Sequence, residues 1–153
     1  MNHDEVEILL VEDNQDDVEL TLHALKSEKV RNVIHVARDG EEALDFLYGR
    51  EGDKQRPQRN QLRLILLDLK LPKVDGLEVL REIKSNPRTK PIPVVVLTSS
   101  REERDMVESY RLGVNSYIQK PVDFNQFRES VKQLGLYWLV VNQAPPREAF
   151  ESR

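Results

Sequence analysis

The chain has 153 residues, of which 39% are hydrophobic and 33% are charged, and its formal net charge is −4. These values fit one globular domain with a full core and argue against a general nucleic-acid binder. The absence of cysteine excludes disulfides, thiolate metal sites and cysteine nucleophiles.

The predicted elements alternate between strand and helix along the chain. Strands are predicted over residues 7–11, 32–36, 64–68, 93–97 and 116–119, and helices over residues 16–27, 40–48, 76–85, 101–112 and from about residue 123. This repetition predicts an α/β fold with a mainly parallel, doubly wound five-stranded sheet and helices on both faces. The long polar connection 49–63 is expected to be a surface loop.

The N-terminus and the apolar segments bear on location and partners. Residues 1–5 are polar and acidic, unlike a signal peptide, and no apolar stretch approaches the length of a membrane span. After the fifth strand about one helix and a tail remain, which leaves no room for a DNA-binding helix-turn-helix domain. We therefore expect a cytoplasmic protein with no membrane or DNA partner.

Side chains capable of metal and phosphoryl chemistry follow or end four of the predicted strands. In chain order they are Glu12 and Asp13, Asp68, Thr98 and Lys120. Function gathers at the carboxyl ends of the strands in parallel sheets. Each residue alone would be an ordinary polar strand end, but five of complementary types favour a functional site.

Three carboxylates in one cleft would repel one another and raise one another's pKa values. A divalent cation removes this conflict, and an all-oxygen site with open positions suits Mg²⁺. Asp68 is the candidate nucleophile, which would form an acyl phosphate. Lys120 and Thr98 would contact the phosphoryl oxygens, because phosphoryl transfer depends on positioning and on neutralised charge.

The order and spacing of several motifs match a known family. Over roughly residues 7–134 the chain resembles the receiver domain of two-component response regulators, in Glu12-Asp13-Asn14, in Asp68 with Pro72 and Asp75-Gly76, in Thr98-Ser99 and in Lys120-Pro121. The resemblance implies a flavodoxin-like receiver fold. It also implies that Asp68 accepts a phosphoryl group from a phosphohistidine on a sensor histidine kinase.

The resemblance also implies how the site works. Mg²⁺ would be bound by Asp13, Asp68 and the main-chain carbonyl of Lys70, with Glu12 acting mostly through water. The side chain of Lys70 would pair with Glu12 or reach the phosphoryl group, and both alternatives stay open.

A switch pair is implied in the same way. Thr98 would move onto the phosphoryl group while the ring of Tyr117 turns inward to fill the vacated space. A narrower resemblance, in the long loop, the segment 93–99 and the C-terminal extension, is to stand-alone response regulators paired with bacterial and cyanobacterial phytochromes. It implies a bacteriophytochrome-type kinase as the partner.

The C-terminal segment is more apolar than one helix face requires. Phe124, Phe127, Val131, Leu134, Trp138 and Val141 recur at helical spacing, which predicts a helix packed on the sheet. Four further apolar residues lie off this stripe and need a cover. We expect a homodimer whose interface includes Phe127, Leu136, Tyr137, Trp138 and Leu139; the alternative is an extension folded back on its own domain.

These features predict one receiver domain over residues 1–141, including the dimerisation extension, followed by a flexible tail over residues 142–153. The function expected is a phosphorylation-driven signalling switch and not an enzyme with a separate substrate. A phosphorylation-independent interaction module and a phosphate sink remain alternatives. An aspartyl-phosphate hydrolase would need an aspartate where Lys70 stands. A flavodoxin-like flavin binder would need a hydroxyl-rich phosphate loop after the first strand, but that loop holds acidic residues that would repel a phosphate, namely Glu12, Asp13, Asp16 and Asp17.

Overall fold

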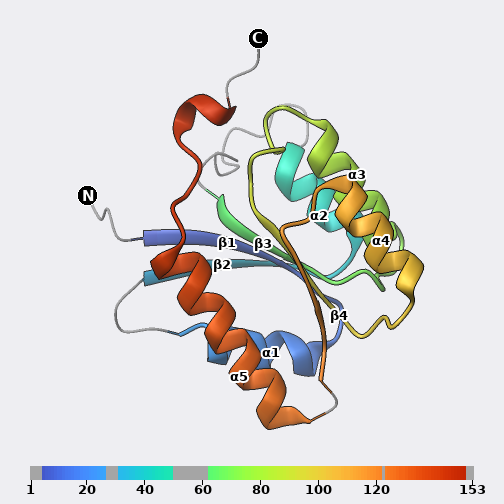
Figure 1. The fold of residues 1–153 in the computed structure, drawn as a ribbon, viewed down its shortest axis with the longest axis vertical. Coiled ribbons are helices and arrows are strands. Elements are labelled where there is room, and N and C mark those ends of the chain that lie inside the picture. The colour runs from blue at the N-terminus through green and yellow to red at the C-terminus, as the bar shows by residue number, and fades with distance from the viewer. Residues whose placement is uncertain (1–4, 27–30, 50–61, 122, 151–153) are drawn as a thin grey trace.

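The computed structural model describes residues 5–26, 31–49, 62–121 and 123–150 (Figure 1). Its regular elements are β1 (Glu5–Val11), α1 (Gln15–Ala24), β2 (Arg31–Ala37), α2 (Gly40–Tyr48), β3 (Leu62–Leu67), α3 (Gly76–Ser85), β4 (Val94–Thr98), α4 (Glu103–Leu112), β5 (Ser116–Gln119), α5 (Phe124–Gly135), the π-helix η2 (Leu136–Val141) and the 3₁₀ helix η3 (Arg147–Phe150). The predicted order of strands and helices is confirmed.

The five strands form one parallel sheet in the order β2-β1-β3-β4-β5. Helices α1 and α5 cover one face, and α2, α3 and α4 cover the other (Figure 1). The predicted doubly wound, flavodoxin-like fold with a C-terminal helical extension is therefore confirmed. Strands β3 and β4 are buried on both sides, which explains their nearly continuous apolar sequences.

Alternating side chains of β1 pack into two separate hydrophobic cores. Leu9 and Val11 pack with the helices α2 and α3, whereas Ile8 and Leu10 pack with α1 and α5. Successive residues of a strand point to opposite faces, so a shift of one residue would exchange these two sets. This register fixes the carboxyl end of β1, from which Glu12 and Asp13 project.

Some element boundaries differ from the predicted ones. Helix α1 ends at Ala24, three residues before the predicted end, because the chain turns at Leu25. Asp68 lies just beyond β3, and Thr98 is the last residue of β4. Most of the predicted loop 49–63 lies outside the described residues.

The C-terminal extension folds onto the same chain. Gly135 lies so close to α1 that an added Cβ would come within 2.8 Å of Leu25 Cδ2. Phe127 and Leu139 are buried in the core beneath α1 and α5. Leu136 and Tyr137 are exposed, and Trp138 is half-buried.

The residues after η2 also touch the domain. Arg63 of β3 donates from Nη2 to the carbonyl oxygen of Asn142 at 3.3 Å, and Phe150 of η3 packs against the core on the α2–α3 side. The flexible tail over residues 142–153 stays a prediction. Among the helices of the described ranges, none has the length and apolar character needed to cross a bilayer.

Candidate functional site

The acidic residues after β1 and β3 meet at one edge of the sheet. Glu12, Asp13 and Asp68 each offer a carboxylate oxygen, and these oxygens lie within 4.8 Å of one another. The neighbouring strands hold them there, because the Asp68 amide donates to the Val11 carbonyl at 3.0 Å. Glu12 and Asp68 are buried, whereas Asp13 is exposed.

Lys120, just after β5, is the cation in this cluster. Its Nζ lies 2.6 Å from Glu12 Oε1, 2.7 Å from Asp17 Oδ2 and 3.3 Å from Asp68 Oδ2, and its side chain is 9% exposed. Burial alone would lower the pKa of this amine, but the surrounding carboxylates, Asp68 foremost, outweigh burial and raise it above its ordinary value. Lys120 therefore stays charged.

The other oxygen of Asp68 is held by two hydrogen-bond donors. The Thr98 hydroxyl donates to Asp68 Oδ1 at 2.7 Å, and the Lys70 amide donates to the same atom at 3.1 Å. A Cβ on Gly76 would lie 2.5 Å from the Asp68 carbonyl oxygen, so only glycine lets α3 begin this close to the site. The carboxylate is thus fixed in orientation from both sides.

One lysine does not balance the negative charge at this edge. Burial and then the Asp68 carboxylate raise the pKa of Glu12 from 4.5 to about 7, against the opposing effect of Lys120. Three converging carboxylates, one of them exposed to solvent, fit a divalent cation with oxygen ligands. The triad can therefore hold such a cation.

The sequence matches the family model of the response regulator receiver domain over residues 8–132. This chain belongs to the response regulator receiver family. It is therefore a signalling phosphoacceptor protein and not an enzyme with a separate substrate. Receiver membership agrees with the sheet order and with the position of the acidic triad.

Two relatives are similar over most of their length. The chain is 44% identical to the probable methanogenesis regulatory protein FilR2 of Methanothrix harundinacea, over 90% of this chain and 86% of that protein. It is also 44% identical to the response regulator Rcp1 of Synechocystis, over 86% of this chain and 88% of that protein.

Solved structures of response regulators are similar too. The Mn²⁺-bound form of Rcp1 is 41% identical with a TM-score of 0.86, covering 92% of this chain and 99% of that one. The phosphorylated cyanobacterial phytochrome response regulator RcpA is 43% identical (TM-score 0.84; 93% and 99% covered). The bacteriophytochrome response regulator AtBRR is 53% identical (TM-score 0.67; 90% and 98% covered).

The two residues of the implied switch pair, Thr98 and Tyr117, lie on the neighbouring strands β4 and β5. Tyr117, in β5, is half-buried, and its hydroxyl donates to the Ser100 carbonyl oxygen at 3.4 Å. Ser100 in turn donates from its amide to Thr98 Oγ1 at 3.2 Å. Thr98 and Tyr117 are therefore both connected to the loop between β4 and α4.

Two acidic residues of the site were missed by sequence reasoning. Asp17 pairs with Lys120 because Asn14 caps α1, accepting from the Asp17 amide at 3.0 Å, and so sets the first turn of α1 beside the site. Asp105, in the first turn of α4, is buried and receives a hydrogen bond from Ser100. Their sequence signal is that of ordinary first-turn acids, which favour any helix N-terminus.

The Lys70 side chain does not pair with Glu12, one of the two alternatives left open by the sequence, and its contact with a phosphoryl group stays a prediction. Its Nζ lies 3.6 Å from Asp105 Oδ2 and 3.9 Å from Glu102 Oε1, on the α4 side of the site. The backbone of Lys70 nevertheless stays at the acceptor, through the amide that donates to Asp68. The side chain is 53% exposed, so packing does not fix it.

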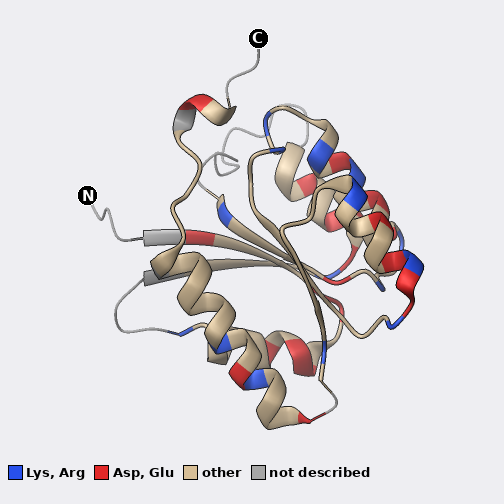
Figure 2. Ribbon diagram, in the orientation of Figure 1, with Lys and Arg blue, Asp and Glu red and all other residues tan. Residues whose placement is uncertain are grey.

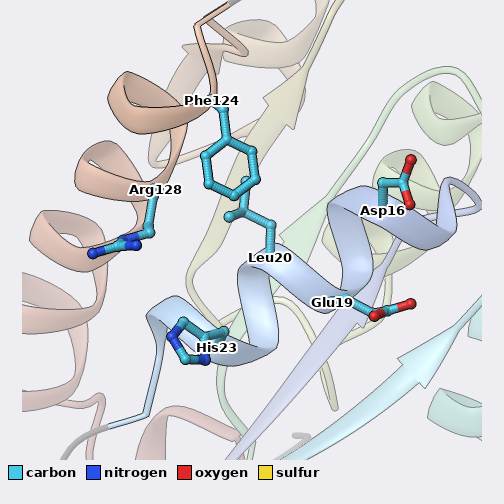
Figure 3. Close-up of a pocket in the computed structure, with 6 residues that line it drawn as sticks. All are labelled: Asp16, Glu19, Leu20, His23, Phe124 and Arg128. Carbon is cyan, nitrogen blue, oxygen red and sulfur yellow. The ribbon is translucent and has the colours of Figure 1, made fainter.

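A groove lies beside the site, between α1 and α5 (Figure 3). Its volume is about 520 Å³, and its lining residues are Asp16, Glu19, Leu20, His23, Phe124 and Arg128. Phe124 and Leu20 form its apolar centre, with the carboxylates along one side and Arg128 on the opposite helix (Figure 3). Phe124 is 62% exposed, so its ring is accessible from solvent.

Proposed function

We propose that Asp68 accepts a phosphoryl group from a sensor histidine kinase in a Mg²⁺-dependent reaction, and that the acyl phosphate switches the binding of a partner. The observation that carries this proposal is that each oxygen of the Asp68 carboxylate is contacted by a different side chain. Thr98 holds Asp68 Oδ1 and Lys120 holds Asp68 Oδ2, within a cluster of two further acids.

The transfer needs little covalent chemistry from the protein. An oxygen of Asp68 forms the new O–P bond while the N–P bond of the donor phosphohistidine breaks, and the histidine nitrogen leaves with the electron pair. Lys120 pairs with one oxygen of the transferred group, and the Thr98 hydroxyl donates to another. Both donors already touch Asp68, so neither has to be recruited from a distance.

Mg²⁺ would be held by Asp13, Asp68 and the main-chain carbonyl of Lys70, with Glu12 acting through water. When bound, the cation neutralises charge on the carboxylates and on the phosphoryl oxygens. The raised pKa of Glu12 and the convergence of three carboxylates support a cation here. Magnesium is the ion with the matching preference for oxygen ligands and retained water.

Thr98 and Tyr117 would carry the change outward. A phosphoryl group on Asp68 draws the Thr98 hydroxyl toward itself, which alters its bond with the Ser100 amide. The ring of Tyr117, bonded to the Ser100 carbonyl, then turns inward. The shared attachment of both residues to Ser100 supports this coupling.

We assign the kinase to the phytochrome type, in the cytoplasm. RcpA and AtBRR, similar to this chain over nine-tenths of its length, are phytochrome and bacteriophytochrome response regulators. The probable methanogenesis regulatory protein FilR2 is as similar to this chain as Rcp1 is, at 44% identity. A sensor kinase of another type is therefore the second candidate for the phosphoryl donor. Incubation with phytochrome-type and unrelated kinases, with phosphoryl transfer followed over seconds to minutes, separates the two.

The C-terminal extension would form a homodimer. Leu136 and Tyr137 are exposed on η2, and Trp138 beside them is half-buried. Phe127 and Leu139, also predicted for the interface, are covered by their own chain and would support it from beneath. The dimer interface is therefore centred on the exposed pair.

The deciding experiment is mass spectrometry after incubation with acetyl phosphate, with and without Mg²⁺. The wild type should gain one phosphoryl group only with Mg²⁺, and Asp68→Asn should gain none. Asp75→Asn, at an exposed acid before α3, is the matched control and should be phosphorylated like the wild type. No gain in the wild type would favour a phosphorylation-independent interaction module.

A further inference from the structure

Asp105 is a buried carboxylate outside the acidic triad. It lies in the first turn of α4 and is 7% exposed. Its Oδ2 accepts a hydrogen bond from the Ser100 hydroxyl at 2.6 Å and lies 3.6 Å from Lys70 Nζ. A buried carboxylate needs such partners, because its desolvation is costly.

Both partners of Asp105 are connected to the acceptor. The Lys70 amide donates directly to Asp68 Oδ1, and the Ser100 amide donates to Thr98 Oγ1, which itself donates to Asp68 Oδ1. Lys70 thus has its backbone at Asp68 and its ammonium group at α4. Lys70 therefore connects the acceptor Asp68 with helix α4.

We propose that Asp105 is a positioning residue that competes with a phosphoryl group on Asp68 for the ammonium group of Lys70. The inference rests on the proposed function. A phosphoryl group on Asp68 would carry close to two negative charges in place of the single charge of the carboxylate, beside the Lys70 backbone. The Lys70 side chain is half-exposed and flexible, so it moves toward whichever anion attracts it more strongly.

The exchange has a consequence for α4. When the Lys70 ammonium group turns to the phosphoryl group, the Asp105 carboxylate loses this partner and keeps its hydrogen bond from the Ser100 hydroxyl. The first turn of α4 then loses its ionic link to the loop after β3. This link adds a second connection between Asp68 and α4, separate from the ring of Tyr117.

The test measures affinity for beryllium fluoride, an analogue of the phosphoryl group, in the presence of Mg²⁺. Asp105→Asn keeps the shape of the side chain and removes its charge, so the ammonium group is released. We expect binding about two- to fivefold tighter, the size of a partly exposed ion pair. Lys70→Met should bind more weakly, and the double variant should match Lys70→Met.

Glu102→Gln is the control, because Glu102 is 3.9 Å from Lys70 Nζ and more exposed than Asp105. Its affinity should stay within about twofold of the wild type. An unchanged or weaker affinity in Asp105→Asn would overturn the inference. The same would follow if tighter binding persisted without Lys70, since Asp105 would then act only as a general negative charge.

Folding of each variant is checked by thermal unfolding. If Asp105→Asn does not fold, the wild type decides the question by NMR: the ε-methylene signal of Lys70, assigned by its loss in Lys70→Met, should shift when the analogue binds. An unmoved signal overturns the inference alone. A wild type that binds no beryllium fluoride overturns the proposed function together with the inference.

Discussion

At the scale of single residues, the site is built around Lys120. Its ammonium group contacts three carboxylates, from the first turn of α1 and from the ends of β1 and β3. Such a group both stabilises the fold and prepares the site for a phosphoryl group. The two roles can be separated by measuring stability with and without a divalent cation.

Lys120→Met should lower the free energy of unfolding by about 2–4 kcal/mol in metal-free buffer, because the buried acids lose their cation. Mg²⁺ should restore part of the loss. Urea denaturation measures both values. Lys73→Met is the control: Lys73 pairs with Asp39 at 3.7 Å but is 61% exposed, so its loss should cost under about 1 kcal/mol. Equal losses in the two variants would contradict this account.

Glu12 makes the stability of the metal-free protein depend on pH. Its pKa is about 7 in the folded protein and 4.5 otherwise, so the folded state binds the proton more tightly. The free energy of unfolding should therefore fall as pH rises from 4.5 to 7, by on the order of 1–3 kcal/mol, and level off above.

Glu12→Gln should flatten this fall, as measured by urea denaturation at successive pH values with a chelator present. The raised pKa of Lys120 works at alkaline pH: its contribution is complete below 10.5 and is lost only above that value. It does not disturb the window from 4.5 to 7. An unchanged slope in Glu12→Gln would assign the pH dependence to other groups.

At the scale of elements, the N-termini of α1 and α5 lie beside the site, where we expect a phosphoryl donor protein to bind. Asp17 pairs with Lys120, and its neighbour Asp16 lines the same groove as Phe124 (Figure 3). We therefore expect a protein that presents a donor histidine to Asp68 to contact this groove. A small phosphodonor need not touch it.

Phe124→Ala should slow phosphorylation by a kinase that phosphorylates the wild type, by about tenfold or more, because exposed aromatic rings at interface centres dominate binding. Phosphorylation by acetyl phosphate should be unchanged. Tyr110→Ala, at another exposed ring, on α4, is the control. Kinase rates that fall equally in both variants, or in neither, would remove the groove from donor docking.

The elements were largely predictable because strand and helix leave different periodicities. The five strand-end residues of the site were predictable too, since a parallel sheet gathers its carboxyl ends. Asp17 and Asp105 were not, because an acid in a first helical turn is common and gives no sign of its distant partner. The direction of the Lys70 side chain was equally hidden, since its acidic partners are more than 30 residues away in sequence.

At the scale of the whole molecule, exposed apolar residues lie both on α4 and on η2. Acidic and basic residues alternate over α3 and α4 (Figure 2), which gives those helices no basic surface for nucleic acid. The exposed apolar residues of η2 lie at the end of α5 (Figure 1). We expect assembly through η2, because its sequence holds no charged residue, whereas the exposed apolar residues of α4 are interspersed with charged ones.

Sedimentation should show a dimer at concentrations of about tens of micromolar. Leu136→Glu combined with Tyr137→Glu should give a monomer, because charges would be buried in an apolar contact. Met106→Glu, at an exposed apolar position of α4, should leave the dimer intact. A monomeric wild type would refute the dimer, and a dimeric double variant would place its interface elsewhere.

The order of the site residues along the chain has a consequence for folding during synthesis. A ribosome completes β1 and β3, with their acids, well before it adds Lys120 at the end of β5. A nascent chain that has begun to pair β1 with β3 thus carries an acidic edge without its ammonium group. Until synthesis passes the fifth strand and adds Lys120, protons and dissolved cations have to neutralise that edge. Cellular Mg²⁺ would therefore assist the folding of the nascent domain.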